Sequence, residues 1–128
     1  MSLIEYHNEG IHTVRWVRGD AVMVDAHELT ASFLLAPDTI VESWKPATIS
    51  DIDEAAIEAV LALRPELVLL GTGSTQCMPA PVLLGAFLRR GIGMEAMDNA
   101  AAARTFNLLV AEGRRVVAAF LLPGGSSR

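Results

Sequence analysis

The sequence predicts an α/β fold with a mixed central sheet covered by helices, a C-terminal β-α-β-α-β unit and an N-terminal antiparallel hairpin beside or over the sheet. Before Pro46 the apolar residues alternate, as in strands that bury one face. After Pro46, helical spacings and short continuous apolar runs follow one another, which is typical of helices and fully buried strands. The length of 128 residues, with 52% hydrophobic and 20% charged residues, predicts a single domain over residues 1–128.

The N-terminal part is expected to form a small antiparallel layer. Alternation places Val14 and Trp16 on one face of the first strand and Val17 on the other. Gly19 and Asp20 then interrupt the pattern and predict a tight hairpin, because glycine adopts the positive φ that such turns need. The expected strands cover residues 11–18, 21–24, 32–35 and 39–44.

The first helix is expected over residues 51–63. Ser50 is a suitable N-cap, and Asp53, three residues later, resembles the second member of a capping box. Apolar residues then recur at helical spacing until Pro65 stops the helix.

The rest of the chain alternates strands and helices. Pro79 and Pro81 suit the first turn of a helix that runs to Arg90, with Gly91 as its left-handed terminator. Asp98 is expected to cap the last helix. The expected elements are strands over 67–70, 92–97 and 115–122, helices over 79–90 and 99–112, and a frayed tail over 124–128.

A candidate binding site lies where the parallel strands end. Residues 71–77, 97–99 and 123–124 all follow such ends, and ligands favour this edge of an α/β sheet. Loop N–H groups, the start of the last helix and an arginine within it favour an anionic ligand. The candidate residues are Gly71, Thr72, Gly73, Asp98, Arg104 and Asn107.

Each candidate also has a structural interpretation. The glycines can serve only to turn the chain, and Asp98 only to cap a helix. Arg104 can pair with an acidic residue, and Asn107 can hold a neighbouring segment in place. The sequence leaves both interpretations open.

Other chemistry has little support. No lysine follows the glycines, which excludes a phosphate-binding P-loop, and Gln76 stands where a dinucleotide fingerprint needs its third glycine. The three histidines lack metal-ligand spacing, and Cys77 is the one cysteine. We expect no metal and no cofactor, and the residues indicate no particular reaction.

Charge and composition narrow the partners. A net charge of −5 argues against nucleic acid, and apolar runs are too short for a membrane span. The first residues lack a basic region followed by an apolar run, and one cysteine fits a reducing compartment, so we expect a cytoplasmic protein.

Several segments together resemble a known family. They are residues 32–37 with Trp44, 66–73, 91–98, 103–109 and 112–116. The set is similar to a family of small domains of unknown function from bacteria and archaea. Its eukaryotic branch includes the third assembly factor of mitochondrial complex I (NADH:ubiquinone oxidoreductase). Asn99 and Phe106 depart from the family pattern, which often has Thr and Tyr there.

The resemblance implies a three-layer α/β domain and supplies no catalytic residues. It favours a non-catalytic interaction module that binds a protein partner. The alternative is a binding protein or enzyme for a small anionic molecule, which would use the candidate residues above. Association into a homo-oligomer, through strand edges or Trp16, is compatible with either.

Overall fold

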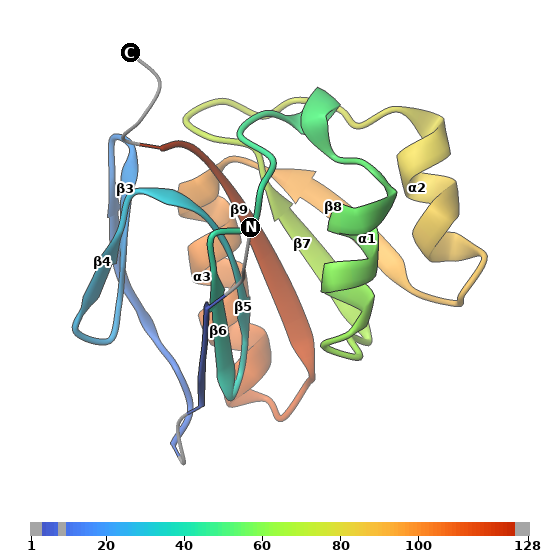
Figure 1. The fold of residues 1–128 in the computed structure, drawn as a ribbon. Helices are drawn as coiled ribbons and strands as arrows, with labels where there is room; N and C mark the ends of the chain where they lie inside the picture. The colour runs from blue at the N-terminus through green and yellow to red at the C-terminus, as the bar shows by residue number, and fades with distance from the viewer. Residues whose placement is uncertain (1–3, 8–9, 125–128) are drawn as a thin grey trace.

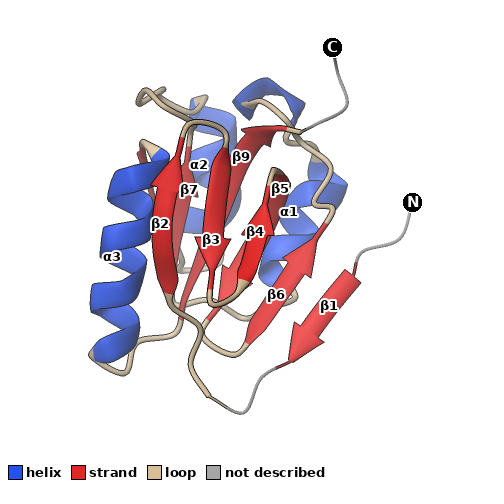
Figure 2. Ribbon diagram, turned by 90° about the vertical axis from the view of Figure 1, so that its left-hand side faces the viewer, coloured by secondary structure: helices blue, strands red, loops and turns tan. Residues whose placement is uncertain are grey.

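The computed structural model describes residues 4–7 and 10–124, which form three layers (Figures 1 and 2). The middle layer is a six-stranded sheet of order β1-β6-β5-β9-β7-β8. Its strands are β1 (Ile4–His7), β5 (Ala31–Ala36), β6 (Thr39–Glu42), β7 (Leu67–Gly71), β8 (Gly93–Met97) and β9 (Val116–Pro123). A second sheet has the order β2-β3-β4 and consists of β2 (Val14–Arg18), β3 (Ala21–Val24) and β4 (His27–Leu29).

The helices and the small sheet cover the two faces of the large sheet. Helices α1 (Glu54–Leu61) and α2 (Pro81–Leu88) lie on one face, and α3 (Asn99–Ala111) lies with the small sheet on the other (Figures 1 and 2). A short 3₁₀ turn, η1 (Ile49–Asp51), precedes α1. This arrangement confirms the predicted α/β fold class.

Parallel and antiparallel pairing both occur in the large sheet. β7 pairs in parallel with β8 and with β9, which confirms the β-α-β-α-β unit. β9 also pairs antiparallel with β5, so the sheet is mixed as predicted. The predicted hairpin is present too, because β2 and β3 pair antiparallel around Gly19 and Asp20.

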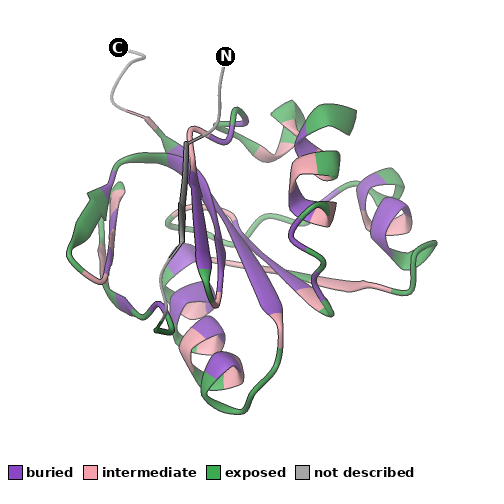
Figure 3. Cartoon of the chain, turned by 60° about the horizontal axis from the view of Figure 1, so that its bottom comes forward, coloured by how far each residue is buried: buried purple, intermediate pink, exposed green. Residues whose placement is uncertain are grey.

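Apolar side chains fill both faces of the sheet, and Figure 3 shows the burial concentrated in its central strands. Phe33 of β5 and Phe120 of β9 stack with their ring centres 4.9 Å apart, on the face that α3 and the small sheet cover. Trp44, Val60 and Phe87 belong to the core on the opposite face, beneath α1 and α2. The two cores therefore share the central strands.

The face assignment predicted for β2 is wrong beyond Val14. Val14 pairs with Val24, but Trp16 pairs with Met23, so a bulge at Arg15 shifts the register. A bulge adds one residue and reverses the side-chain alternation after it. Val17 therefore packs against the core, and Trp16 turns away from it.

The predicted N-terminus of the first helix is also wrong. The N-cap of α1 is Asp53, whose carboxylate accepts a hydrogen bond from Ala56 N–H at 2.9 Å. Ser50 lies instead within η1, where Thr48 and Asp51 form the capping box. The capping pair Thr48 and Asp51, two residues before the predicted pair Ser50 and Asp53, thus starts a separate short turn.

Other elements differ from the prediction in smaller ways. β1 and the three-residue β4 were not predicted, and β6 ends at Glu42, before Trp44 enters the core. In the predicted frayed tail, residues 125–128 lie outside the described part of the chain.

Candidate functional site

A crevice is present at the carboxyl ends of the parallel strands. In the sheet register Gly71, the last residue of β7, lies opposite Met97 of β8 and Phe120 of β9. The crevice has a volume of about 490 Å³. Its walls are Thr72 to Thr75 and Cys77 of the loop, Leu121 and Pro123 of β9, Asp20 of the hairpin, and residues 47–49.

The polar groups of this loop bind mainly to the loop itself. The Thr72 hydroxyl donates to the Thr75 carbonyl at 2.6 Å and accepts from the Cys77 N–H at 3.1 Å. The Gln76 amide donates to the Ala96 carbonyl at 2.9 Å. These hydrogen bonds stabilise one loop conformation. They also occupy the Thr72 hydroxyl, which would otherwise be available to a ligand.

Asn99, which sequence analysis did not select as a site residue, lies beneath the loop. The residue is only 2% exposed, and its Nδ2 donates to the Leu121 carbonyl at 3.1 Å. Among the described residues its Oδ1 has no hydrogen-bond partner, and a Cβ placed on Gly71 would lie 2.2 Å from that oxygen. Gly71 is therefore required by close packing. Gly73 is required by its φ of +100°.

Asp98 has the capping role that its position suggested. Its carboxylate accepts a hydrogen bond from Ala101 N–H at 2.7 Å, at the start of α3. The next residue, Asn99, donates its N–H to the Gly73 carbonyl at 2.8 Å. Gly71, Thr72, Gly73 and Asp98 are thus neighbours at the strand ends.

The other two candidates lie elsewhere. Arg104 and Asn107 belong to the side of α3 that faces β2, in a groove of about 340 Å³ between the helix and that strand. Asn107 binds the backbone of Val14 through both ends of its amide. The amide holds a neighbouring segment, and neither side chain lines the crevice at the strand ends.

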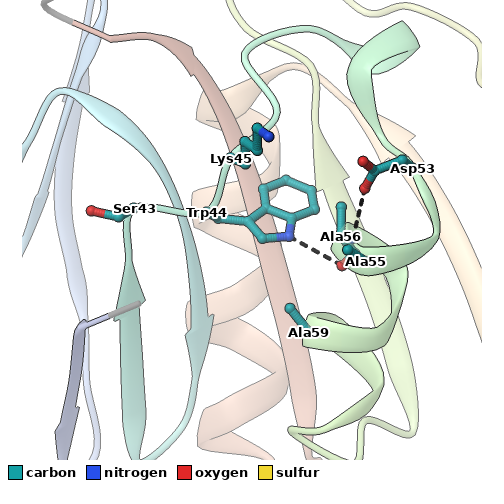
Figure 4. A pocket seen from close by; sticks show the side chains of 7 residues that line it. All are labelled: Ser43, Trp44, Lys45, Asp53, Ala55, Ala56 and Ala59. Carbon is teal, nitrogen blue, oxygen red and sulfur yellow. Dashed lines mark hydrogen bonds between the residues drawn. The ribbon is translucent and has the colours of Figure 1, made fainter. Parts of the chain in front are cut away.

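A further hollow surrounds Trp44, which the sequence singled out only as part of the family resemblance (Figure 4). The indole Nε1 donates to the Ala56 carbonyl at 3.1 Å, and the ring is 4% exposed. Lys45 and Asp53 lie at the rim of this hollow of about 290 Å³. The indole joins the end of β6 to the first turns of α1, so we assign it a packing role.

Two ionisable side chains in contact with each other, His12 and Asp25, lie apart from the crevice walls. His12 is buried, and its Nδ1 lies 2.6 Å from the Asp25 carboxylate, while no group of the residues that the structure describes forms a hydrogen bond with its Nε2. Within residues 4–7 and 10–124, no cluster of three or more His, Cys, Asp or Glu side chains is arranged to hold a metal ion. The same part of the chain contains no helix with the length and apolar character needed to cross a membrane.

The most exposed large apolar side chains are found before and within α2. Met78 is 74% exposed and Val82 is 80% exposed, and Ala80 and Pro81 between them are exposed as well. Pro79, between Met78 and Ala80, is buried. A group of neighbouring exposed apolar residues is typical of a protein interaction surface. We call Met78, Ala80, Pro81 and Val82 the α2 surface. The sequence did not point to this surface, because Pro79 and Pro81 indicated only a helix start.

Comparisons with known proteins agree with the resemblance seen in the sequence. The profile of a family described as "Protein of unknown function (DUF498/DUF598)" matches residues 14–121. The chain is 36% identical over 96 residues to a Mus musculus protein named NADH dehydrogenase (ubiquinone) 1 alpha subcomplex assembly factor 3. That match covers 73% of this chain and 51% of the mouse protein, so the chain spans about half of that relative's length.

Solved structures share the fold along most of their length. An NMR structure of a Xanthomonas campestris protein matches with a TM-score of 0.82 and 44% identity, covering 91% of this chain and 89% of that one. A Bordetella pertussis protein described as an Mth938-like domain matches with a TM-score of 0.76 and 30% identity, covering 97% of this chain and 94% of that one.

Proposed function

The chain belongs to the DUF498/DUF598 family of proteins of unknown function, and on that premise we propose that it is a non-catalytic interaction module that assists the assembly of a larger complex. The mouse relative is named as an assembly factor of NADH dehydrogenase. By that likeness, the partner we propose is a subunit of NADH dehydrogenase in the cell from which the chain comes.

The observation that carries this proposal is the α2 surface. Met78 and Val82 are exposed to water over most of their area, although the transfer of large apolar side chains out of water is favourable. The site residues expected to bind a ligand are largely occupied by internal hydrogen bonds, as for Thr72 and Asp98. Both features suit a domain that acts by binding a protein.

Affinity capture from the source cell tests the proposal. The tagged wild-type chain should capture NADH dehydrogenase subunits, and Val82→Glu should reduce their yield at least about tenfold, because a buried carboxylate opposes association. Leu108→Glu is the matched control: Leu108 is 59% exposed and lies on α3, in the opposite layer. Circular dichroism confirms that both variants are folded. Absence of those subunits from the wild-type capture, or an equal loss with Leu108→Glu, contradicts the proposal.

The second candidate function is the binding of a small anion in the crevice. The crevice has a volume of about 490 Å³ and lies at the carboxyl ends of β7 and β9, and both features favour the binding of a small ligand. Inorganic phosphate and citrate are suitable probes. At 100 times its Kd a ligand stabilises the folded state by about 2.7 kcal/mol, which raises the Tm by several degrees. Amide shifts confined to residues 72–75 would support the crevice, and an unchanged Tm with both probes would exclude them as ligands.

We also propose that residues 1–128 are a single folding unit that acts in the cytoplasm. The exposed Cys77 is the sole cysteine, and a free thiol suits a reducing compartment. Fractionation of the source cell checks the location, and recovery in the membrane or secreted fraction would contradict it.

A further inference from the structure

The groove between β2 and α3 combines an apolar floor with two arginines. Val17, Ala100 and Ala103 line it, and the exposed side chains of Arg15 and Arg104 stand on its two sides. Arg15 comes from the strand and Arg104 from the helix, which lie next to each other in Figure 2. The groove lies in the layer opposite to α1 and α2.

Within the described part of the chain, the arginines beside this groove have no carboxylate within 4 Å. Arg90, Arg114 and Arg115 each have a carboxylate within 4 Å, on Glu58, Glu66 and Asp38 respectively. Among the described residues, Arg15, Arg18 and Arg104 form no ion pair. In a chain of net charge −5, this is a local basic surface.

An aromatic ring adds to the surface. The Arg18 guanidinium lies 4.3 Å from the centre of the Trp16 ring, within the range of a cation–π contact. Trp16 reaches this position because the bulge at Arg15 turns it away from the core. The bulge therefore places the Trp16 ring beside the groove, next to Arg15.

The backbone of β2 is also available along part of this groove. β2 is an edge strand of the small sheet. Arg18 and Ala21 close a two-residue hairpin as a hydrogen-bonded pair, so the next pair, Val17 and Val22, directs its N–H and C=O groups outward. Asn107 already occupies the corresponding groups of Val14. The backbone of Val17, which lies between the Asn107 amide and the hairpin turn, thus offers a hydrogen-bond donor and an acceptor to a bound segment.

We infer that this groove binds an acidic, extended segment of a partner polypeptide. The segment pairs with the backbone of Val17, and its carboxylates bind Arg104 and Arg15 through charge-assisted hydrogen bonds. Charge complementarity selects this occupant, and the net charge of −5 opposes a nucleic acid. The inference goes beyond the proposed function, since it concerns a different face from the α2 surface.

A peptide titration followed by NMR tests it. The probe is Ac-Val-Glu-Val-Glu-Val-NH₂, and the matched control peptide carries Gln in place of both Glu residues. With the whole chain we expect shifts of the Val17, Ala103 and Arg104 amides, lost in Arg104→Gln and weakened by salt. Arg89→Gln is the control variant, because Arg89 is exposed at the end of α2. Val82→Glu should leave the titration unchanged, which separates this site from the α2 surface.

Four outcomes would overturn the inference. They are the absence of shifts in the groove at millimolar peptide, equal binding of the Gln peptide, equal weakening by Arg89→Gln, and tighter binding of oligo-dT than of the Glu peptide at the same amides. The last outcome would assign the groove to single-stranded nucleic acid instead.

Discussion

The side chain of Asn107 on α3 takes the place of a neighbouring strand for Val14 on β2. Its Oδ1 accepts from the Val14 N–H at 3.0 Å, and its Nδ2 donates to the Val14 carbonyl at 2.9 Å. Both backbone groups belong to the open edge of the small sheet, and one amide satisfies both of them. This pair of bonds joins the small sheet to the helix layer.

Asn107→Ala should therefore destabilise the chain. The substitution leaves a donor and an acceptor of Val14 without partners, which costs about 1–3 kcal/mol. Urea unfolding measures the loss, and hydrogen exchange should show faster exchange at Val14. Leu108→Ala, at an exposed neighbouring position, should change stability by less than about 0.5 kcal/mol. Equal effects of the two substitutions would contradict this role of Asn107.

Gly71→Ala should be among the most destabilising small substitutions in the chain. The new Cβ would meet Asn99 Oδ1 at 2.2 Å, and the buried amide cannot move without losing its bond to Leu121. We expect a loss of about 2–4 kcal/mol in the free energy of unfolding. Gly93→Ala is the control, since its Cβ would be 3.5 Å from Leu67, an ordinary contact. A loss for Gly71→Ala no larger than for Gly93→Ala would show that the packing is looser than described.

The two candidate caps of α1 can be separated by substitution. Asp53→Ala removes the side chain that accepts from Ala56 N–H and should cost about 1 kcal/mol. Ser50→Ala should cost much less, because the hydrogen bond of the Ser50 hydroxyl goes to the Thr48 hydroxyl, in an exposed turn, and not to a backbone N–H of α1. Thermal unfolding of both variants checks this order, and the reverse order would restore the cap predicted from the sequence.

Acid should weaken the fold partly through Asp38. Partial burial acts to raise the pKa of Asp38, but the hydrogen bond from Thr39 and the charge of Arg115 outweigh it and leave that pKa below its ordinary value of 3.8. A carboxyl with a lowered folded-state pKa stabilises the protein above its ordinary pKa, and this stabilisation disappears as the pH falls through the folded-state value.

The Tm of Asp38→Asn should consequently fall less steeply than that of the wild type below about pH 4. The hydrogen bonds from Thr48 also lower the pKa of Asp51, which acts in the same direction in both proteins. Glu112→Gln, at an exposed position after α3, serves as the control. Parallel acid curves for wild type and Asp38→Asn would refute the role of Asp38.

The two cores should unfold together. Neighbouring residues of β9 face opposite layers: Ala118 and Phe120 belong to the core with α3, and Ala119 and Leu121 to the core with α1 and α2. Loss of this strand removes support from both cores, so we expect one cooperative transition for the whole chain. Coincident urea curves from tryptophan fluorescence and far-UV circular dichroism test this; two separated midpoints would divide the chain into two units.

The C-terminal half of the fold could be predicted because its signals are local. A continuous apolar run over residues 67–70 indicates a buried strand, and Pro81, Gly91 and Asp98 mark helix ends. The N-terminal half was less predictable. The bulge at Arg15 leaves no mark in the alternation, and β4, with the sequence His-Glu-Leu, is too short to show a period.

The candidate site residues also divide into those whose position could be predicted from the sequence and those whose position could not. Gly71, Thr72, Gly73 and Asp98 could be placed together because they follow the ends of adjacent strands. The position of Arg104 and Asn107 could not, since it depends on the packing of β2 against α3, a contact between residues 14 and 107. Asn99 was placed at this edge but not among the candidate residues, because its importance comes from a close approach to Gly71 that only the folded chain brings about.

Protein binding through the α2 surface can be detected in the source cell by incorporating the photo-crosslinking amino acid p-benzoylphenylalanine at position 82. We expect a discrete adduct that contains a subunit of NADH dehydrogenase, and no such adduct when the same group replaces Leu108. If position 82 yields no subunit adduct, or position 108 yields it equally, the chain does not bind this partner through the α2 surface.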